Sequence, residues 1–175
     1  MRCFIAIDLP ENLKKEIIQI QKKIPAFKGK LTEKENLHLT LKFIGEISED
    51  SIKDIKEKLK QIKFKRFKAK LGEIGTFSES FIKIVWIELE NCDALQKEID
   101  DSLKDLFKKE ERFMSHLTIA RVKSIESTKK VFIEKLKKVK VDPLEFEVGD
   151  FSLKKSILTE KGPIYADILK VDLIQ

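Results

Sequence analysis

The residues best suited to chemistry are the two histidines, because each begins the same tripeptide, His-Leu-Thr, at His38 and again at His116. The chain has only 19 leucines and 6 threonines among its 175 residues, so chance is a poor explanation for the repeat. Both copies lie in β-like runs, LHLTLKF and SHLTIAR. The repeat therefore predicts two related strands, each carrying one imidazole and one hydroxyl.

Side chains alternate between the two faces of a strand, so the His and the Thr of each copy should project together. In the first run, His38, Thr40 and Lys42 would face outward, and Leu37, Leu39, Leu41 and Phe43 would pack beneath helices. In the second run, His116 and Thr118 would face outward, opposite Leu117 and Ile119. Two such strands at one groove would gather two imidazoles and two hydroxyls around a single substrate.

This set of groups suits the hydrolysis of a cyclic phosphodiester. One imidazole can take a proton from water while the other protonates the leaving sugar oxygen, because histidine titrates near neutral pH. Threonine hydroxyls can donate hydrogen bonds to the non-bridging phosphate oxygens as charge develops there. No metal is required, and the residues themselves do not determine which histidine is the acid.

Two other interpretations of the histidines compete with acid–base catalysis. A single histidine in an apolar strand is more often a packed core residue, but a matched pair argues against that interpretation. A metal site would need more ligands, and no Asp, Glu or Cys stands at a recognised ligand spacing from either histidine. We therefore expect no metal and no cofactor.

The flanking sequence predicts the elements that position these strands. Strand-like runs occur at residues 2–8, 37–44, 67–77, 81–90, 116–122, 143–158 and 163–173. Apolar residues at helical spacing predict helices with stripes over 13–24, 52–62, 95–106 and 132–139. Pro10 suits the first turn of the first helix; Ser48 or Asp50 can cap the second, and Asn91 or Asp93 the third.

Helices between strands, together with hairpin-like strand pairs, predict an α/β (α+β) fold with largely antiparallel sheets. No linker or low-complexity segment divides the chain. We therefore expect one domain over residues 1–175, built as two lobes, each a sheet with helices on its outer face.

The composition is that of a folded protein, with 42% hydrophobic and 38% charged residues. No apolar run approaches the roughly 18 residues of a membrane span, and the N-terminus lacks signal-peptide features, so we expect a cytoplasmic protein with no membrane partner. The net charge of +6 favours a polyanionic partner, although a lysine- and glutamate-rich composition is also typical of hyperthermophiles. Cys3 and Cys92 form no zinc motif and are expected to be small buried residues.

The paired motifs resemble those of the two-histidine (2H) phosphoesterases, and more narrowly those of the RNA 2′,3′-cyclic phosphodiesterases, also called 2′-5′ RNA ligases. The resemblance covers nearly the whole chain, since RCFIAIDLP, LHLTLKFIGEI, SHLTIARV and SLKKSILTEKGPIYADIL are all similar to that branch. Ser115 is a small departure, because many relatives have proline before the second motif.

The resemblance implies a bilobal fold with pseudo-twofold symmetry around a central cleft. It implies metal-independent hydrolysis of RNA 2′,3′-cyclic phosphate ends to 2′-phosphomonoesters, with reverse 2′-5′ RNA ligation as a further activity. His38 would be the proton donor, His116 the proton acceptor, and Thr40 and Thr118 would bind the phosphate. The partners would be RNA with cyclic phosphate ends, tRNA fragments among them, or cyclic nucleotides, and we expect a monomer.

Four further residues are candidates for substrate binding: Arg121, Lys42, Phe4 and Tyr165. Strict alternation aims Arg121 away from the groove, so it reaches the substrate only if its strand bends or ends. Phe4 and Tyr165 could either stack a base or pack in the core.

Two features have an ordinary explanation beside a functional one. Trp86 fits the core better than a stacking platform. The basic segment 60–70, KQIKFKRFKAK, could track a phosphate backbone or form the solvated side of a helix end. The positive charge also leaves open a different class of protein, a non-catalytic module that binds phosphorylated RNA ends, which turnover would distinguish from an enzyme.

Overall fold

The computed structural model describes residues 1–160 and 162–175. Within these ranges the helices are α1 (Glu11–Gln21), α2 (Glu49–Lys60), α3 (Asp93–Ser102) and α4 (Lys129–Leu136), and a 3-10 turn spans Lys34–Asn36. The strands are β1 (Arg2–Asp8), β2 (Phe27–Leu31), β3 (His38–Glu46), β4 (Phe67–Thr76), β5 (Ile84–Glu90), β6 (His116–Ile125), β7 (Glu145–Val148), β8 (Asp150–Thr159) and β9 (Gly162–Asp172). This combination confirms the predicted mixed α/β class.

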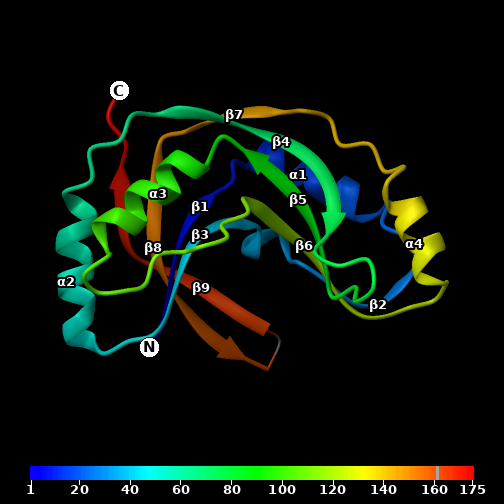
Figure 1. The fold of residues 1–175 in the computed structure, drawn as a ribbon, viewed down its shortest axis with the longest axis horizontal. Helices are drawn as coiled ribbons and strands as arrows, with labels where there is room; N and C mark the ends of the chain where they lie inside the picture. The colour runs from blue at the N-terminus through cyan, green and yellow to red at the C-terminus, as the bar shows by residue number, and fades with distance from the viewer. Residues whose placement is uncertain (161) are drawn as a thin grey trace.

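The strands form one strongly curled antiparallel sheet in the order β7-β4-β5-β6-β3-β1-β8-β9, with β2 paired to β6 (Figure 1). At its centre β3 and β6 meet through a single residue pair, Leu39 with Leu117. This narrow junction divides the molecule into the two predicted lobes, although hydrogen bonding continues from one lobe to the other.

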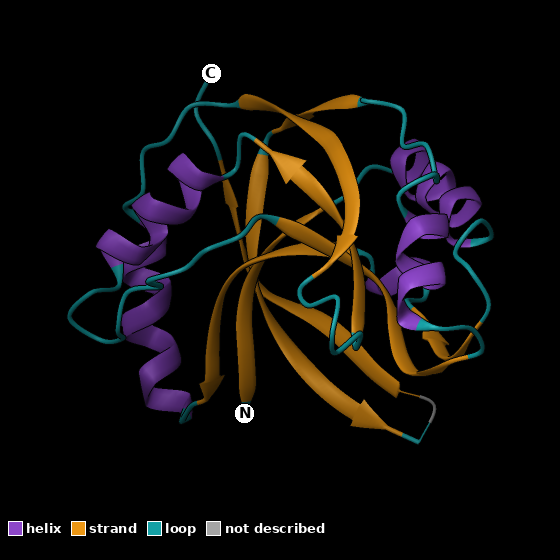
Figure 2. Cartoon of the chain, turned by 45° about the vertical axis from the view of Figure 1, so that its right-hand side comes forward, coloured by secondary structure: helices purple, strands orange, loops and turns teal. Residues whose placement is uncertain are grey.

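Helices cover the outer side of each lobe, α2 and α3 on one side and α1 and α4 on the other (Figure 2). α3 packs against β3 and α1 against β6, so each motif strand is backed by a helix from the other half of the chain. The apolar stripes predicted for these helices are buried, including Leu13 and Ile17 on α1 and Leu95 and Ile99 on α3. This backing leaves the opposite face of both motif strands available to a substrate.

Two predicted elements differ from the structure. The run 143–158 is not one strand, because Gly149 separates β7, which pairs with β4, from β8, which pairs with β1. The run therefore links the two lobes. β2 was absent from the prediction because its five residues, FKGKL, include a central glycine and only two apolar side chains, and the strand forms by pairing with β6.

The helix caps were predicted with mixed success. Ser48 caps α2 by accepting a hydrogen bond from the Ser51 N–H at 3.3 Å, as predicted. At α3 the prediction of Asn91 or Asp93 is wrong, since the N-cap is Cys92, whose side chain makes no capping bond. Asn91 instead adopts a left-handed backbone with a φ of 75°, and its side chain donates to the Lys68 carbonyl at 3.1 Å.

Both cysteines are buried and unpaired, as predicted, with exposures of 1% for Cys3 and 0% for Cys92. Burial raises the pKa of the Cys92 thiol to about 12, which makes it a poor nucleophile at neutral pH. Among the described residues, no helix is long and apolar enough to cross a membrane.

Candidate active site

One cleft between the lobes, with a volume of about 530 Å³, gathers the polar residues of both motifs. His38, Thr40, His116 and Thr118 all line it, as expected from their places on the two strands. All four side chains are half-buried, so the fold restrains them while a ligand can still reach them. The antiparallel junction between β3 and β6 relates the two motifs by an approximate twofold axis.

The same backbone contact orients both imidazole rings. Nδ1 of His38 donates to the carbonyl of Asn36, and Nδ1 of His116 donates to the carbonyl of Met114, each at 2.7 Å. A carbonyl oxygen only accepts, so each Nδ1 carries a proton and each Nε2 is left for other partners. In His38, Nε2 lies 3.0 Å from Thr40 Oγ1, which donates to it while the ring is neutral.

An extra residue in each motif strand breaks the alternation of its side chains. The register of β1 on β3 skips Leu41, and the register of β5 on β6 skips Ile119. The first six residues of the two strands consequently share one burial pattern. Beyond each bulge, side chains project from the face opposite to the one that strict alternation predicts.

The bulge in β3 reverses the predicted sides of Lys42 and Phe43, and both predictions are wrong. Lys42 is only 5% exposed and lies on the helix side, whereas Phe43 is 71% exposed and lines the cleft. The matching bulge in β6 brings Arg121 into the cleft. Arg121 could reach a substrate only through such a break in the alternation of its strand. Phe43 and Arg121 therefore occupy equivalent positions in the two lobes, five residues after their histidines.

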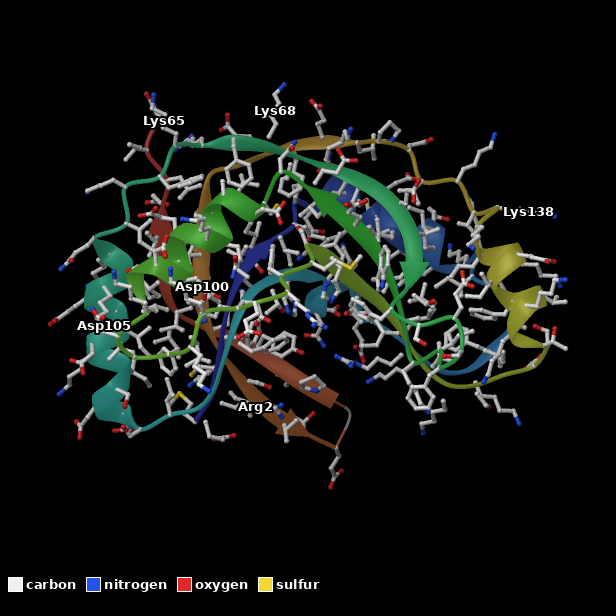
Figure 3. The ribbon with its side chains drawn as sticks, in the orientation of Figure 1. Arg2, Lys65, Lys68, Asp100, Asp105 and Lys138 are labelled. Carbon is white, nitrogen blue, oxygen red and sulfur yellow. The ribbon has the colours of Figure 1, made fainter. Side chains whose placement is uncertain are left out.

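Lys42 ends in a buried polar cluster between β3 and α3. Its Nζ forms an ion pair with Asp100 and donates to the Lys108 carbonyl at 2.8 Å (Figure 3 labels Asp100). Asp100 also accepts from Gln96 Nε2 and from the Glu110 N–H, each at 2.8 Å. Burial raises the pKa of the Asp100 carboxyl, but the hydrogen bonds, led by that from Lys42, hold it below its ordinary value. The cluster ties α3 and the loop after it to the first motif strand.

Aromatic rings surround His38. The Phe4 ring lies 5.0 Å from the His38 ring and 4.9 Å from that of Tyr165, and Tyr165 meets His38 edge-on at 5.1 Å between centroids. Desolvation in this setting lowers the pKa of His38 to about 4. Burial also raises the pKa of Tyr165.

The structure separates the two aromatic candidates for substrate binding. Both Phe4 and Tyr165 line the cleft, but Phe4 is only 4% exposed and Tyr165 is half-buried. Phe4 therefore packs against the His38 ring as a buried side chain, whereas part of Tyr165 remains accessible to a ligand.

The second histidine has a different neighbour. His116 meets the exposed ring of Phe77 edge-on at 4.8 Å, and Phe77 in turn lies 5.9 Å from Trp86. The prediction that Trp86 packs in the core is wrong, because it is half-buried and lies opposite Thr118 in the β5–β6 register, although it does not line the cleft. Its indole Nε1 is buried without a hydrogen-bond partner among the described residues.

Positive charge at the cleft comes from residues that the sequence reasoning did not select, apart from Arg121. Arg2 and Lys30 also line the cleft, and Lys30 pairs with the cleft residue Glu33. Within residues 1–160 and 162–175, neither Arg2 nor Arg121 forms an ion pair. The basic segment 60–70 contributes no lining residue, and Figure 3 shows Lys65 and Lys68 at the edge of the molecule opposite Arg2.

Other lining residues escaped the sequence reasoning, including Asn36, Leu158 and Pro163. Asn36 joins two parts of the site, because its carbonyl holds His38 and its side chain donates to the Pro163 carbonyl at 3.0 Å. No local motif marks these residues, since they meet only through the pairing of distant strands. Phe43 could have been found by aligning the two HLT copies and comparing it with Arg121.

The two motifs bring two imidazoles and two threonine hydroxyls to the cleft, a combination that favours proton transfer and anion binding over metal coordination. In the part of the chain that the structure describes, no three His, Cys, Asp or Glu side chains gather as a metal site.

The family described as "LigT like Phosphoesterase" matches this chain twice, over residues 7–86 and again over residues 88–165. The chain belongs to the LigT-like phosphoesterase family. Each match contains one HLT motif. The matches are halves of the chain and not lobes, because the first includes β2 and β3 and the second includes β6 and β8, which lie on opposite sides of the β3–β6 junction.

Relatives match this LigT-like chain over most of its length. A Methanocaldococcus jannaschii protein named RNA 2′,3′-cyclic phosphodiesterase is 46% identical over 171 residues, which cover 94% of this chain and 96% of the relative. A Thermotoga maritima protein of the same name is 35% identical, covering 94% of this chain and 91% of the relative.

Solved structures show the same fold. A Thermus thermophilus structure, 28% identical, superposes with a TM-score of 0.80 over 99% of this chain and 98% of its own. Escherichia coli LigT complexed with 3′-AMP, 24% identical, superposes with a TM-score of 0.78 over 99% of this chain and 98% of its own.

Proposed function

We propose that this LigT-like phosphoesterase hydrolyses RNA 2′,3′-cyclic phosphate ends to 2′-phosphomonoesters by acid–base catalysis between His38 and His116. The observation that carries the proposal is the convergence of two identically oriented imidazoles and two threonine hydroxyls on one cleft. Relatives named RNA 2′,3′-cyclic phosphodiesterase, similar over nearly the whole chain, support the substrate class.

The shape of the cleft supports His38 as the acid. In an in-line displacement, the attacking water and the leaving O3′ lie on opposite sides of phosphorus. On the His38 side the cleft continues over β1 and the β8–β9 hairpin and includes the rings of Phe4, Phe43 and Tyr165. On the His116 side β6 contributes Thr118 and Arg121, and its neighbour β2 adds Lys30 and Leu31 but no aromatic ring. The nucleoside therefore fits on the His38 side, where that ring would protonate O3′ while His116 takes a proton from water.

The acid role requires His38 to gain a proton when the substrate binds. With a pKa of about 4, the free ring is neutral near pH 7 and accepts a hydrogen bond from Thr40. A bound phosphodiester places a negative charge beside the ring, which favours the imidazolium form. Thr40 is then released from Nε2 and can donate to a phosphate oxygen instead.

The remaining cleft groups would hold the phosphate during the reaction. Thr40 and Thr118 lie at equivalent places beside the two histidines, so their hydroxyls can bind different non-bridging oxygens. Arg121 adds a positive charge on the His116 side, where charge builds up as water attacks. Catalysis would thus combine proton transfer with fixed hydrogen-bond donors.

Turnover of a short RNA ending in a 2′,3′-cyclic phosphate tests the proposal. The expected product keeps its phosphate on the 2′-oxygen, which phosphorus NMR distinguishes from a 3′-phosphate, and activity should survive EDTA. His38→Ala and His116→Ala should each abolish turnover while circular dichroism shows a folded chain. Full activity in either variant contradicts the proposed roles, and tight binding without product would favour a non-catalytic end-binding module.

The same groups can also catalyse opening of the cyclic phosphate by an RNA hydroxyl instead of water. If the 5′-hydroxyl of a second RNA replaces water, it attacks the cyclic phosphate, O3′ leaves as before, and a 2′-5′ phosphodiester forms. The bond made and the bond broken are both phosphodiester bonds, so this ligation needs no energy source. Incubating both RNA halves at high concentration and assaying the joined product measures its share against hydrolysis.

A further inference from the structure

The β8–β9 hairpin extends past β1 as a two-stranded arm beside the cleft (Figures 1 and 2). Its cleft-facing side carries two successive cross-strand pairs, Ser156 with Tyr165 and Leu158 with Pro163, and all four residues line the cleft. The cleft therefore does not end at His38 but continues along this arm.

Two large apolar side chains on this path are exposed. Leu158, on the hairpin, is 75% exposed, and Phe43, on β3, is 71% exposed. Both line the cleft, on opposite sides of β1, which lies between β3 and β8 in the sheet. Exposed apolar groups beside the polar residues of the cleft indicate a ligand with flat apolar surfaces.

The charges along the path favour an anionic ligand. Arg2 lies on β1 between the two apolar side chains, and it pairs in register with Ser156 of the hairpin (Figure 3). Lys30 also lies near the hairpin turn, since a Cβ atom built on Gly162 would stand 2.8 Å from its Nζ, but it is paired there with Glu33, so Arg2 is the main positive charge on this path. A ligand that combines flat apolar rings with regularly spaced negative charges is single-stranded nucleic acid.

We propose that Phe43, Leu158 and Arg2 form a second nucleotide subsite, which binds the nucleotide immediately 5′ of the one that carries the cyclic phosphate. The inference rests on the proposed function, because it takes the reacting phosphate to lie between the histidines with its nucleoside on the His38 side. The neighbouring base stacks on Phe43 and contacts Leu158, and Arg2 contacts the phosphate that joins the two nucleotides. The preferred substrate is therefore an RNA chain and not a cyclic mononucleotide.

Comparing substrates of increasing length tests the subsite. The substrates are adenosine 2′,3′-cyclic phosphate and the di- and trinucleotides that end in the same group. We expect kcat/KM to rise roughly tenfold from the mononucleotide to the dinucleotide, as one stacked base and one phosphate are added. Equal values for the mono- and dinucleotide would overturn the proposal.

Variants locate the effect on the named residues. Phe43→Ala, Leu158→Ser and Arg2→Gln should each lower the ratio of the dinucleotide value to the mononucleotide value, and Phe43→Trp should keep it, because an aromatic face remains. Matched controls lie outside the cleft: Leu144→Ser, at an exposed leucine before β7, and Lys138→Gln, at an exposed lysine after α4. A ratio that is unchanged in all three cleft variants, or lowered equally by the controls, contradicts the subsite.

A binding measurement separates this inference from the proposed function. If neither substrate turns over, the proposed function fails, and fluorescence anisotropy with 2′-phosphorylated mono- and dinucleotides still tests the subsite. Tighter binding of the dinucleotide that is lost in Phe43→Ala supports the subsite without catalysis. Equal affinity for the two ligands overturns it.

Discussion

The two motif strands share one backbone plan and differ in what surrounds it. In β3 and in β6 the histidine donates from Nδ1 to the carbonyl two residues earlier, and a bulge follows the threonine. Around His38, the rings of Phe4 and Tyr165 exclude water and lower its pKa to about 4. His116 instead has an edge contact with Phe77.

The difference continues past the bulges. Four residues after each histidine, a side chain is buried on the helix side of the sheet. In β3 it is Lys42, which pairs with Asp100, and in β6 it is Ala120. The residue that turns into the cleft is apolar Phe43 in one lobe and Arg121 in the other. The repeated plan thus positions two like groups, while their neighbours place an exposed aromatic ring after one histidine and a guanidinium at the equivalent position after the other.

The largest expected effect separates the two histidines by the leaving group of the substrate. His38→Ala should lose roughly 10³-fold in kcat on a cyclic phosphate, because O3′ leaves poorly without a proton. On an aryl phosphodiester, p-nitrophenolate leaves without protonation, so the loss should become much smaller. His116→Ala should lose activity on both substrates. The reverse pattern would exchange the two roles.

The next effect concerns the protonation of His38. By proton NMR, His38 in the free protein should titrate near pH 4, below the ordinary value of 6.5, because Phe4 and Tyr165 desolvate its ring. Adding a 2′-nucleotide should raise that pKa, since the phosphate stabilises the imidazolium. The variant His116→Asn leaves one histidine and assigns the signal. A His38 that titrates at 6.5 in the free protein would contradict the desolvation of its ring.

The same shift makes stability depend on pH. Because the pKa of His38 is lower in the folded chain than in the unfolded chain, the unfolded chain binds more protons between pH 6.5 and pH 4. The contribution of His38 to the free energy of unfolding is therefore complete above pH 6.5 and is lost as the pH falls toward 4. Urea unfolding across this range should show a shallower decline for His38→Asn than for the wild type.

Much of this site could be predicted from the sequence, because strand periodicity and a repeated tripeptide are local signals. They placed His38, Thr40, His116 and Thr118 on cleft-facing positions, and all four line the cleft. The bulges have no comparable signal, since an extra residue is defined by the register of a neighbouring strand. Lys42 and Phe43 were therefore assigned to the wrong faces, while Thr40, just before the bulge, was assigned correctly.

Longer-range features of the fold were out of reach for the same reason. The pairing of β2 with β6, and the division of the run 143–158 into strands of different lobes, depend on partners far away in the sequence. The cleft residues Leu158 and Pro163 depend on a hairpin whose direction no local pattern encodes.

The buried ion pair beside the β3 bulge, between Lys42 and Asp100, should contribute strongly to the free energy of unfolding, and β6 has no equivalent pair because Ala120 takes the place of Lys42. Lys42→Met leaves Asp100 buried without its cation, so the free energy of unfolding should fall by about 3 kcal/mol. The double variant Lys42→Met, Asp100→Leu should recover part of that loss, because no lone charge remains. Lys97→Met, which breaks an exposed ion pair on the same helix, is the control and should leave urea unfolding unchanged. Equal effects of Lys42→Met and Lys97→Met would show that the buried cluster does not secure the strand.

The smallest expected effect compares Arg121 with Phe43, the equivalent residues after the two bulges. Arg121→Gln should lower kcat/KM about tenfold on mono- and dinucleotide substrates alike, because its charge faces the reacting phosphate that both contain. Phe43→Ala should instead lower the dinucleotide value more than the mononucleotide value. Lys123→Gln removes the same charge from an exposed position on the same strand outside the cleft and should keep the wild-type values. If Arg121→Gln lowers only the dinucleotide value, Arg121 contacts the rest of the RNA chain and not the reacting phosphate. Arg121 and Phe43 would then not contact different parts of the substrate.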